Sequence, residues 1–428
     1  MNPRLFKLAL AMASLGTSLC VPAQTKYQVS TLPGLGGAFG QGNSINNRDW
    51  VAGAANLEGD TISKATLWIR GSAISLGALG GPSANSAVAW PVKNNLGLVV
   101  GISDTDEDNP LGEAFSCWPF FAPGAPTGKI CKGFRWRNGL MTPLPPFPGG
   151  YNSYATAANN LGEVVGWAEN GVHDATCVAT NQTLQFRAVI WEPWGEMNEL
   201  PPLPNTGDTT TAATAINDRG EVVGISGICD VAVGRFSARH AVLWKHGVPI
   251  DLGSLGGVAW NTPTAINNEG TVVGFSDLAG DSSGAANYQA FIWTRSTGMK
   301  KLPLLPGETR SAAFGVNDKG EVVGLSKVPG TSYHATLWQN GTVTNLNTVT
   351  QPGAPYLIYA NDINDRGEFA GEALDQNTGT APAYIATLLR HWNSSSPAES
   401  TRQSQPLKLP DKLRLQLSQK LGLDPGTD

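Results

Sequence analysis

Charged residues are scarce in this sequence of 428 residues, and so are hydrophobic runs long enough to cross a membrane. Only 15% of the residues are charged, and 34 acidic side chains outnumber 29 basic ones. Because a nucleic-acid-binding surface needs a concentration of Lys and Arg, this acidic balance argues against nucleic acid as a partner. No apolar run beyond the N-terminus reaches the length of a membrane helix, so we expect no membrane span.

The motifs of several enzyme classes are also missing. The chain contains neither GxSxG nor HExxH. The stretch from Gly124 to Lys129 resembles a phosphate-binding loop, but it is one residue short and lacks the following Ser or Thr. We expect His240 and His334 to lie at solvated strand ends, because other copies of the repeat described below carry Lys, Arg or Gln there. The sequence therefore names no catalytic residue.

The first residues have the pattern of a secretory signal peptide. Arg4 and Lys7 precede a short apolar stretch, and small residues follow at Val21-Pro22-Ala23. Cys20 would allow a lipoprotein anchor, but Leu19 before it is too bulky for the usual lipobox. We therefore assign residues 1–23 to a removed leader and expect a secreted or periplasmic protein.

Cysteine is rare, and no CxxC spacing occurs. Four cysteines remain after residue 23, and an even number in an oxidising compartment predicts disulfides rather than metal binding. Cys117 and Cys131 bracket one insertion, so we expect them to pair. Cys177 and Cys229 occupy the same loop position in consecutive repeats, so we expect them to join neighbouring loops.

Glycine and short strand-like segments are abundant, and they recur with a period. The hairpin Ala215-Ile216-Asn217-Asp218-Arg219-Gly220-Glu221-Val222-Val223-Gly224 has six relatives in the chain. The first Asn of the turn falls at Asn46, Asn94, Asn159, Asn217, Asn267, Asn317 and Asn364, with steps of 47 to 65 residues. Asn or Asp in the first two positions suits a type I turn, and Gly supplies the positive φ that follows; Asp49 replaces this Gly in the first copy.

Each copy contains the elements of one propeller blade. A strand of small residues and a Val-Val strand are followed by a third strand that ends in an aromatic residue and by a short fourth strand. Four antiparallel strands repeated without helices predict an all-β fold, a seven-bladed β-propeller over residues 24–390. Small residues suit the innermost strands, which crowd around one axis.

The ends of the chain predict how the ring closes. The seventh copy ends with the third strand Ile385–Leu389, where we place Leu389 at the position of the usual Trp. The segment Tyr27–Leu32 resembles the fourth strands, so we expect it to pair antiparallel with Ile385–Leu389 and to close the propeller. Residues 391–428 read as a polar linker followed, from Asp411, by a short amphipathic helix with Leu413, Leu417 and Leu421 on one stripe.

The repeats resemble the extracellular HAF repeat family over about residues 27–390. The characteristic start of the third strand reads His240-Ala241-Val242 and Gln289-Ala290-Phe291, and the linker LGxLGG occurs at Leu76–Gly81 and Leu252–Gly257. The resemblance implies export and a repeat fold. It implies no particular activity, because the family is defined by its repeat.

Variable loops are expected on one face only, the face that receives the connections after the second and fourth strands. Binding usually resides in such loops on a rigid scaffold. Around the channel mouth on this face we expect six ligand-binding residues: Tyr154, Asp208, Trp260, Arg310, Tyr356 and Tyr359. Ordinary loop packing explains the same residues equally well. We predict a binding module for a glycan or a protein; the alternative is a glycan hydrolase or lyase with its site at the channel mouth. The oligomeric state is not predictable from the sequence.

The acidic stretch Asp104-Thr105-Asp106-Glu107-Asp108 is the one candidate metal site. Alternating carboxylates in a loop can surround a hard cation, so Asp104, Asp106 and Asp108 form a possible calcium site. A solvated acidic loop is the competing interpretation. No motif requires any other cofactor.

Overall fold

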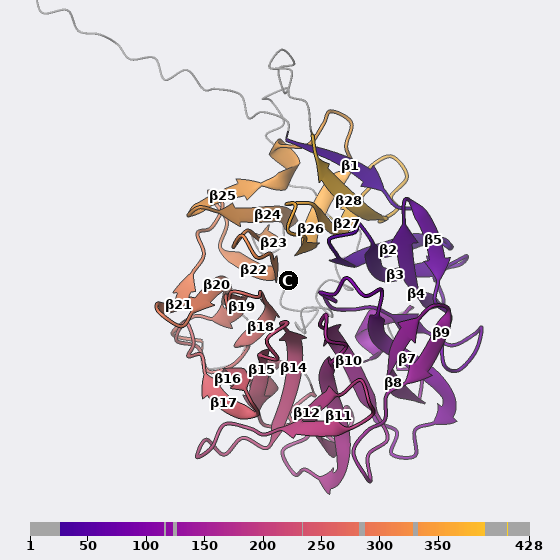
Figure 1. Ribbon diagram of the computed structural model, residues 1–428, viewed down its shortest axis with the longest axis vertical. Helices are drawn as coiled ribbons and strands as arrows, with labels where there is room; N and C mark the ends of the chain where they lie inside the picture. The colour runs from indigo at the N-terminus through magenta and orange to yellow at the C-terminus, as the bar shows by residue number, and fades with distance from the viewer. Residues whose placement is uncertain are drawn as a thin grey trace, which may run out of the picture.

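The described residues of the computed structural model are 26–114, 117–122, 126–232, 234–281, 287–327, 333–389 and Leu409. They form seven four-stranded antiparallel sheets, which follow one another around a central axis as the blades of a propeller (Figure 1). The predicted fold is therefore confirmed. The predicted leader and, apart from Leu409, the predicted linker and C-terminal helix lie outside the described residues.

The strands run in chain order from the axis outwards in six of the blades. Blade 1 contains β2 (Gly36–Ile45), β3 (Val51–Leu57), β4 (Ser63–Ile69) and β5 (Ser72–Ser75), and blade 2 contains β6 (Ser86–Ala87), β7 (Val99–Asp108), β8 (Lys129–Arg137) and β9 (Leu140–Pro143). Blade 3 contains β10 (Ser153–Ala158), β11 (Val164–His173), β12 (Leu184–Trp191) and β13 (Met197–Leu200), and blade 4 contains β14 (Thr210–Ile216), β15 (Val222–Gly227), β16 (His240–Lys245) and β17 (Val248–Asp251).

The remaining blades complete the ring. Blade 5 contains β18 (Thr262–Ile266), β19 (Val272–Asp277), β20 (Tyr288–Thr294) and β21 (Gly298–Lys301), and blade 6 contains β22 (Arg310–Val316), β23 (Val322–Lys327), β24 (Tyr333–Gln339) and β25 (Thr342–Asn345). Blade 7 contains β26 (Tyr356–Ile363), β27 (Phe369–Leu374), β28 (Ala383–Leu388) and β1 (Tyr27–Thr31). Short 3₁₀ turns occur at η1 (Trp118–Phe120), η2 (Arg235–Ala238) and η3 (Leu346–Thr348).

The N-terminal strand β1 closes the ring as the outer strand of blade 7, beside β28 (Figure 1). The pairing is antiparallel and runs from Tyr27 opposite Leu388 to Thr31 opposite Tyr384. The free edge of β1 is partly covered: the Gln351 side chain accepts from Val29 N at 2.8 Å and donates to Val29 O at 2.9 Å. The predicted closure is confirmed, and it protects strand edges that would otherwise invite association.

The register of blade 7 corrects one detail of the sequence interpretation. In blade 4, Val222 lies opposite Trp244, whereas in blade 7 Phe369 lies opposite Ala386, so Ala386 and not Leu389 takes the Trp position. The volume lost by having Ala386 in place of Trp is compensated on the paired strand, because Phe369 occupies the position where other blades have Val. Tyr27 then packs edge-on against Phe369 with ring centroids 4.8 Å apart.

Inter-blade packing explains the repeated aromatic residue. Trp68, Trp191, Trp244 and Trp338 are all almost fully buried between blades. Each donates its indole N–H to a proline carbonyl of the preceding linker: Pro33, Pro145, Pro201 and Pro303, at 2.7 to 3.0 Å. Burying a Trp removes roughly 150–250 Å² of surface from water, worth on the order of 4–6 kcal/mol. This explains why the Trp recurs although no single blade could bury it.

The predicted small inner strands also carry specific links. Thr156, Thr214 and Thr264 occupy equivalent positions, and each hydroxyl donates to a carbonyl of the next blade, at 2.8 to 3.0 Å. The inner strands are thus joined where their small side chains bring the backbones close together.

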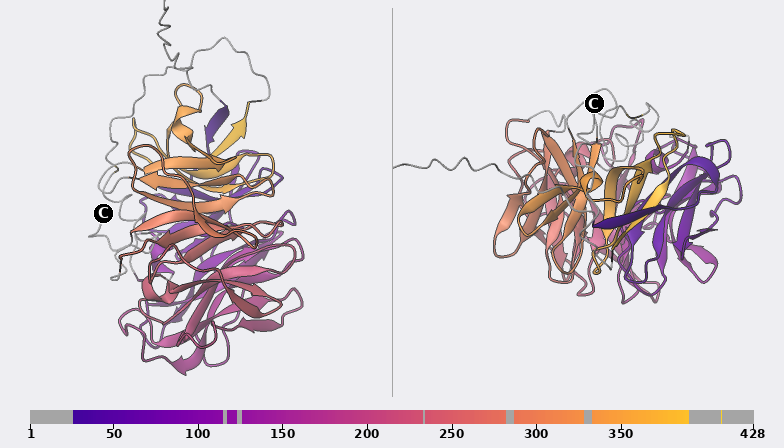
Figure 2. Two further views of the ribbon diagram at one scale, coloured as in Figure 1. Left: turned by 90° about the vertical axis from the view of Figure 1, so that its left-hand side faces the viewer. Right: turned by 90° about the horizontal axis from the view of Figure 1, so that it is seen from above.

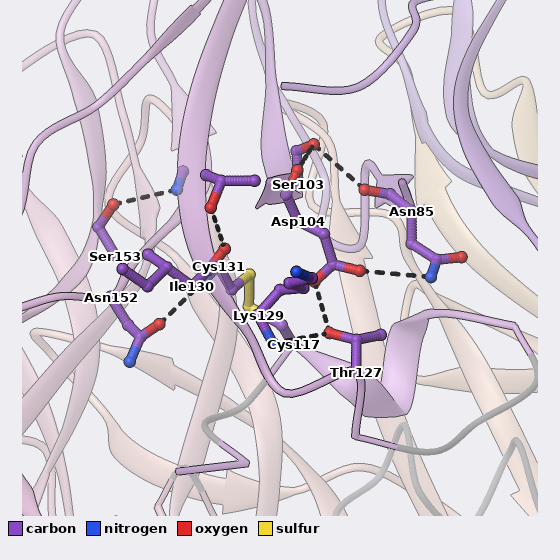
Figure 3. The surroundings of a disulfide bond; sticks show 12 residues. Asn85, Ser103, Asp104, Cys117, Thr127, Lys129, Ile130, Cys131, Asn152 and Ser153 are labelled. Atoms are coloured by element: carbon purple, nitrogen blue, oxygen red, sulfur yellow. Dashed lines mark hydrogen bonds between the residues drawn. A yellow bond between two sulfur atoms is a disulfide. The ribbon is translucent and has the colours of Figure 1, made fainter. Parts of the chain in front are cut away.

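Both predicted disulfides are present. Cys117 and Cys131 have Cα atoms 6.5 Å apart and tie η1 to β8 (Figure 3). Cys177 and Cys229 have Cα atoms 4.6 Å apart and join the loops of blades 3 and 4. Backbone hydrogen bonds continue this second contact, from Val178 N to Asp230 O at 2.8 Å and from Asp230 N to Thr176 O at 3.0 Å.

Candidate functional site

The ring is a disc with two faces, seen edge-on in Figure 2, and the two faces receive different connections. Because antiparallel strands reverse direction at each turn, the tight turns after the first and third strands share one face, which we call the turn face. The connections after the second and fourth strands share the opposite one, the long-loop face. The insertion between β7 and β8, which contains η1, belongs to the long-loop face. This is the arrangement that the sequence predicts.

A large aromatic cluster occupies the inner edge of the long-loop face, and we call it the mouth cluster. Its strand residues come from blades 5, 6 and 7, while Phe236 from blade 4 and Phe39 from blade 1 pack against it. It therefore follows an arc of five consecutive blades. Its buried members are Ala259, Trp260, Phe275, Tyr288, Ala312, Phe314, Leu325, Tyr333, Ile358, Tyr359, Leu374, Ala381 and Leu409.

Four of the six predicted ligand-binding residues come together here. Trp260 and Tyr359 are buried members of the mouth cluster, and Tyr356 packs against it half-buried. Arg310 reaches the same place, because its guanidinium lies over the ring of Tyr288, 5.9 Å from the centroid. Whether these residues bind a ligand stays a prediction.

The other two predicted residues lie elsewhere. Tyr154 is fully buried and stacks on Trp167 with centroids 4.0 Å apart, in a separate cluster that includes Trp90 and Phe120. Burial raises the pKa of Tyr154 well above its usual value. Alternation along a single strand could not predict this stacking. The two rings lie on neighbouring strands of blade 3, and they meet because pairing of the strands places both on one face of the sheet.

Asp208 belongs to a polar group in blade 4. Its Oδ2 accepts from the Ser226 hydroxyl at 2.7 Å and contacts Nδ1 of His240 at 2.8 Å. Burial alone would raise the pKa of Asp208, but the hydrogen bonds from His240 and Ser226 outweigh it and lower the pKa. The hydrogen bond to Asp208 in turn raises the pKa of His240. His240 is therefore a hydrogen-bond partner of Asp208, and not the freely solvated strand end that the sequence predicts.

Polar groups are embedded among the aromatic rings of the mouth cluster. Tyr359 donates its hydroxyl to Oε2 of Glu372, and burial followed by the nearby Glu372 charge raises the pKa of Tyr359. Lys327 donates to the Tyr333 hydroxyl at 3.0 Å, and the Tyr356 hydroxyl donates to Tyr333 O at 2.7 Å. The mouth thus offers apolar area together with fixed hydrogen-bonding groups, the combination typical of ligand sites.

Asp277 at the end of β19 is a carboxyl group with a strongly raised pKa near the mouth. It is fully buried, and neither carboxylate oxygen has a hydrogen-bond partner within the described parts of the chain. Burial and then the Asp281 charge raise the pKa of Asp277 to about 7, against the opposing effect of Arg310. A buried carboxyl group without partners is costly when ionised, so such groups often mark functional positions.

One repeat position accounts for several of these buried groups. The sixth residue of the second strand reads Asn56, Asp104, Glu169, Gly227, Asp277, Lys327 and Leu374 in the seven blades. The position before it holds only Ala or Ser in all seven copies, whereas this one varies in charge and size. Aligning the copies within the chain could therefore have found Asp277 and Lys327 as candidates from the sequence alone.

Glu113 fastens the blade 2 insertion to blade 3. Its Oε1 accepts from the backbone N–H groups of Thr183 and Leu184, at 2.7 and 2.8 Å. Burial and then the adjacent Glu169 charge raise the pKa of Glu113 to about 7. Glu169 is itself held by the Asn152 amide at 2.8 Å.

The acidic stretch is a strand end and not the loop that the sequence predicts, because Asp104 and Asp108 pair with Cys131 and Lys129 within β7 and β8. Asp104 is buried and accepts from the Thr127 hydroxyl at 3.0 Å and from the Asn85 amide at 3.3 Å (Figure 3). Asp108 is exposed and forms an ion pair with Lys129 at 2.6 Å. No group of three or more His, Cys, Asp or Glu is placed to hold a metal ion within the described ranges. Calcium binding by Asp104, Asp106 and Asp108 stays a prediction.

The turn face carries a second feature at the axis. The second residue of each hairpin turn donates its backbone N–H to Oδ1 of the same residue in the next blade, at 2.7 to 3.0 Å. The circle consists of Asn47, Asn95, Asn160, Asp218, Asn268, Asp318 and Asp365. It surrounds a polar cavity of about 60 Å³. The sequence interpretation assigned these residues only to their own turns.

Comparisons with known proteins assign neither a family nor a function to the chain. No family model and no curated protein matches the chain. A streptogramin B lyase structure is 12% identical with a TM-score of 0.47, over 85% of this chain and 98% of that one. The β-propeller domain of the trilobed protease from Pyrococcus furiosus is 8% identical with a TM-score of 0.45, over 90% and 99%. An acylaminoacyl peptidase from Pyrococcus horikoshii is 12% identical with a TM-score of 0.45, and this chain spans only 53% of its length. The HAF resemblance stays a prediction.

Proposed function

We propose that this protein is an exported propeller that binds a protein or glycan ligand at the mouth cluster on its long-loop face. The observation that carries the proposal is the arc of aromatic side chains over five blades, with Lys327, Arg310 and Glu372 among them. Aromatic rings give large contact area, and the fixed polar groups give orientation. Export is supported by the predicted leader and by two disulfides. Among the described residues no helix is long and apolar enough to cross a membrane.

A binding screen tests the proposal. The mature chain is applied to glycan and peptide arrays, and hits are followed by thermal shift, because a ligand of the folded state raises the melting temperature. Tyr356→Ala at the mouth should weaken a hit at least 10-fold. Trp194→Ala is the control, since Trp194 is 74% exposed in a turn-face loop. A hit that responds equally to both substitutions would place binding elsewhere.

Glycan hydrolysis or elimination is the second candidate, and Asp277 favours it. A carboxyl group whose pKa is raised to about 7 keeps its proton near neutral pH and can act as a general acid. The test is turnover of array hits by the wild type and by Asp277→Asn. Loss of turnover in Asp277→Asn with unchanged binding would establish that the protein is an enzyme. Absence of turnover by the wild type on every bound glycan would support a binding module without catalysis.

A further inference from the structure

Among the described residues, the mouth cluster contains one from outside the propeller. Leu409 is 3% exposed and belongs to the same apolar cluster as Trp260, Tyr288 and Tyr359. The last propeller strand in the sequence, β28, ends at Leu388 and is the third strand from the axis in blade 7, next to the outer strand β1. An extended chain advances about 3.3 Å per residue, so the intervening sequence is long enough to return from the rim to the axis.

The burial of Leu409 has a clear physical reason. Full burial of a Leu side chain is worth roughly 1.5–3 kcal/mol. An uncovered aromatic surface of this extent would also be a site of association, because soluble proteins rarely expose large contiguous apolar patches. Burying a leucine side chain at the mouth is therefore favourable, whether the leucine belongs to this chain or to a partner.

The sequence around Leu409 indicates the conformation of such a ligand. It reads Pro406-Leu407-Lys408-Leu409-Pro410. A residue before proline is restricted to extended backbone, and proline itself fixes its φ, so a peptide of this sequence favours an extended backbone. Leucines two positions apart in an extended chain point to the same side.

We propose that the mouth cluster recognises an extended Leu-x-Leu-Pro peptide, and that the chain's own segment around Leu409 is its intramolecular ligand. The inference rests on the proposed binding function and narrows it from glycan or protein to peptide. A partner carrying the same pattern displaces the tethered segment, which makes the C-terminal segment a competitive inhibitor built into the chain.

Tethering sets the size of the expected effect. A segment on a short flexible linker has an effective concentration of about 1 mM at its site. If the free peptide binds with a Kd of about 10–100 µM, the tethered copy weakens binding of an added peptide roughly 10–100-fold. Removing the tethered competitor should restore that affinity.

The test uses the full mature chain and a fluorescent peptide of residues 403–416, with binding measured by anisotropy. Leu409→Asp in the protein should raise the affinity for the peptide at least 10-fold, because a buried carboxylate cannot remain in the cluster. Leu409→Ala should give a smaller gain. Leu161→Asp is the matched control, since Leu161 is 62% exposed in a tight turn of the turn face, and it should behave as the wild type. A peptide that itself carries Leu409→Asp should bind none of the proteins.

Two results would overturn the inference. One is equal peptide affinity of the wild type and Leu409→Asp, with unchanged melting temperatures. The other is a gain that persists in the double variant Leu409→Asp/Tyr356→Ala, because binding would then not involve the mouth. A glycan that binds the mouth, responds to Tyr356→Ala and is indifferent to Leu409→Asp would refute the peptide inference while leaving the proposed function intact. Failure of every array ligand and of the peptide would refute both.

Discussion

Asp365 and Asn47, 318 positions apart in the chain, hold each other across the junction of blades 7 and 1. The backbone N–H of Asp365 donates to Oδ1 of Asn47 at 2.9 Å, and the Asn47 amide donates to Oδ2 of Asp365 at 2.6 Å. The same N–H to Oδ1 bond joins the other six junctions. The circle on the turn face therefore closes the ring independently of β1, and it explains why only Asn or Asp occupies this position.

Replacing Asn47 by Ala should weaken ring closure. The substitution removes two inter-blade hydrogen bonds and leaves the Asp365 N–H without its acceptor, at a cost of about 1–3 kcal/mol. Chemical denaturation followed by Trp fluorescence measures the change. Asn198→Ala is the control, since the Asn198 side-chain amide donates to Glu192 within blade 3, and the loss of stability should be smaller. Equal losses would contradict a special role of the circle.

Removing residues 24–32 should destabilise the whole ring and not blade 7 alone. The deletion exposes the edge of β28 and uncovers Phe369, which packs against Tyr27. Because neighbouring blades bury each other's faces, we expect one cooperative transition at a melting temperature lower by 10 °C or more. Circular dichroism and Trp fluorescence should shift together. An early partial transition beside an unchanged main one would show that the closure is only local.

The two disulfides should contribute unequally. Chain-entropy estimates give about 3 kcal/mol for Cys117–Cys131 and about 4 kcal/mol for Cys177–Cys229, because the closed loops differ in length, 14 against 52 residues. The double variants Cys117→Ala/Cys131→Ala and Cys177→Ala/Cys229→Ala, compared by urea unfolding, should follow this order. Thiol titration of the denatured wild type should find none of these four cysteines free; free thiols would contradict the pairing.

Asp277 should make stability fall as the pH rises from about 4 to about 7. In this window the unfolded chain has lost the proton while the folded protein keeps it, because the folded pKa is raised to about 7. Above pH 7 the folded state must hold an ionised buried carboxylate. Asp277→Asn should therefore raise the melting temperature at pH 8 and leave it nearly unchanged at pH 4. A constant difference between the two proteins at every pH would show that Asp277 has an ordinary pKa when folded.

Much of the architecture follows from the sequence. The sequence predicts the seven hairpins, the closing strand β1 and both disulfides. Turn chemistry and strand alternation are local properties, and the repeat shows which segments are equivalent. Asp49 illustrates this: it replaces a repeated Gly and adopts the positive φ of 61° that the turn requires.

Which side chains meet across strands and blades was decided only by the tertiary structure. Ala386 takes the Trp position in blade 7 because strand register, and not distance from the chain end, determines which residue faces Phe369. Tyr154 is buried against Trp167 and Asp208 is bound to His240, since neighbouring strands supply their partners. The circle of Asn and Asp side chains forms because the ring brings equivalent turns together at one axis. Leu409 reaches the mouth cluster because the folded ring gathers aromatic residues from five blades into one surface, which no local pattern in the sequence encodes.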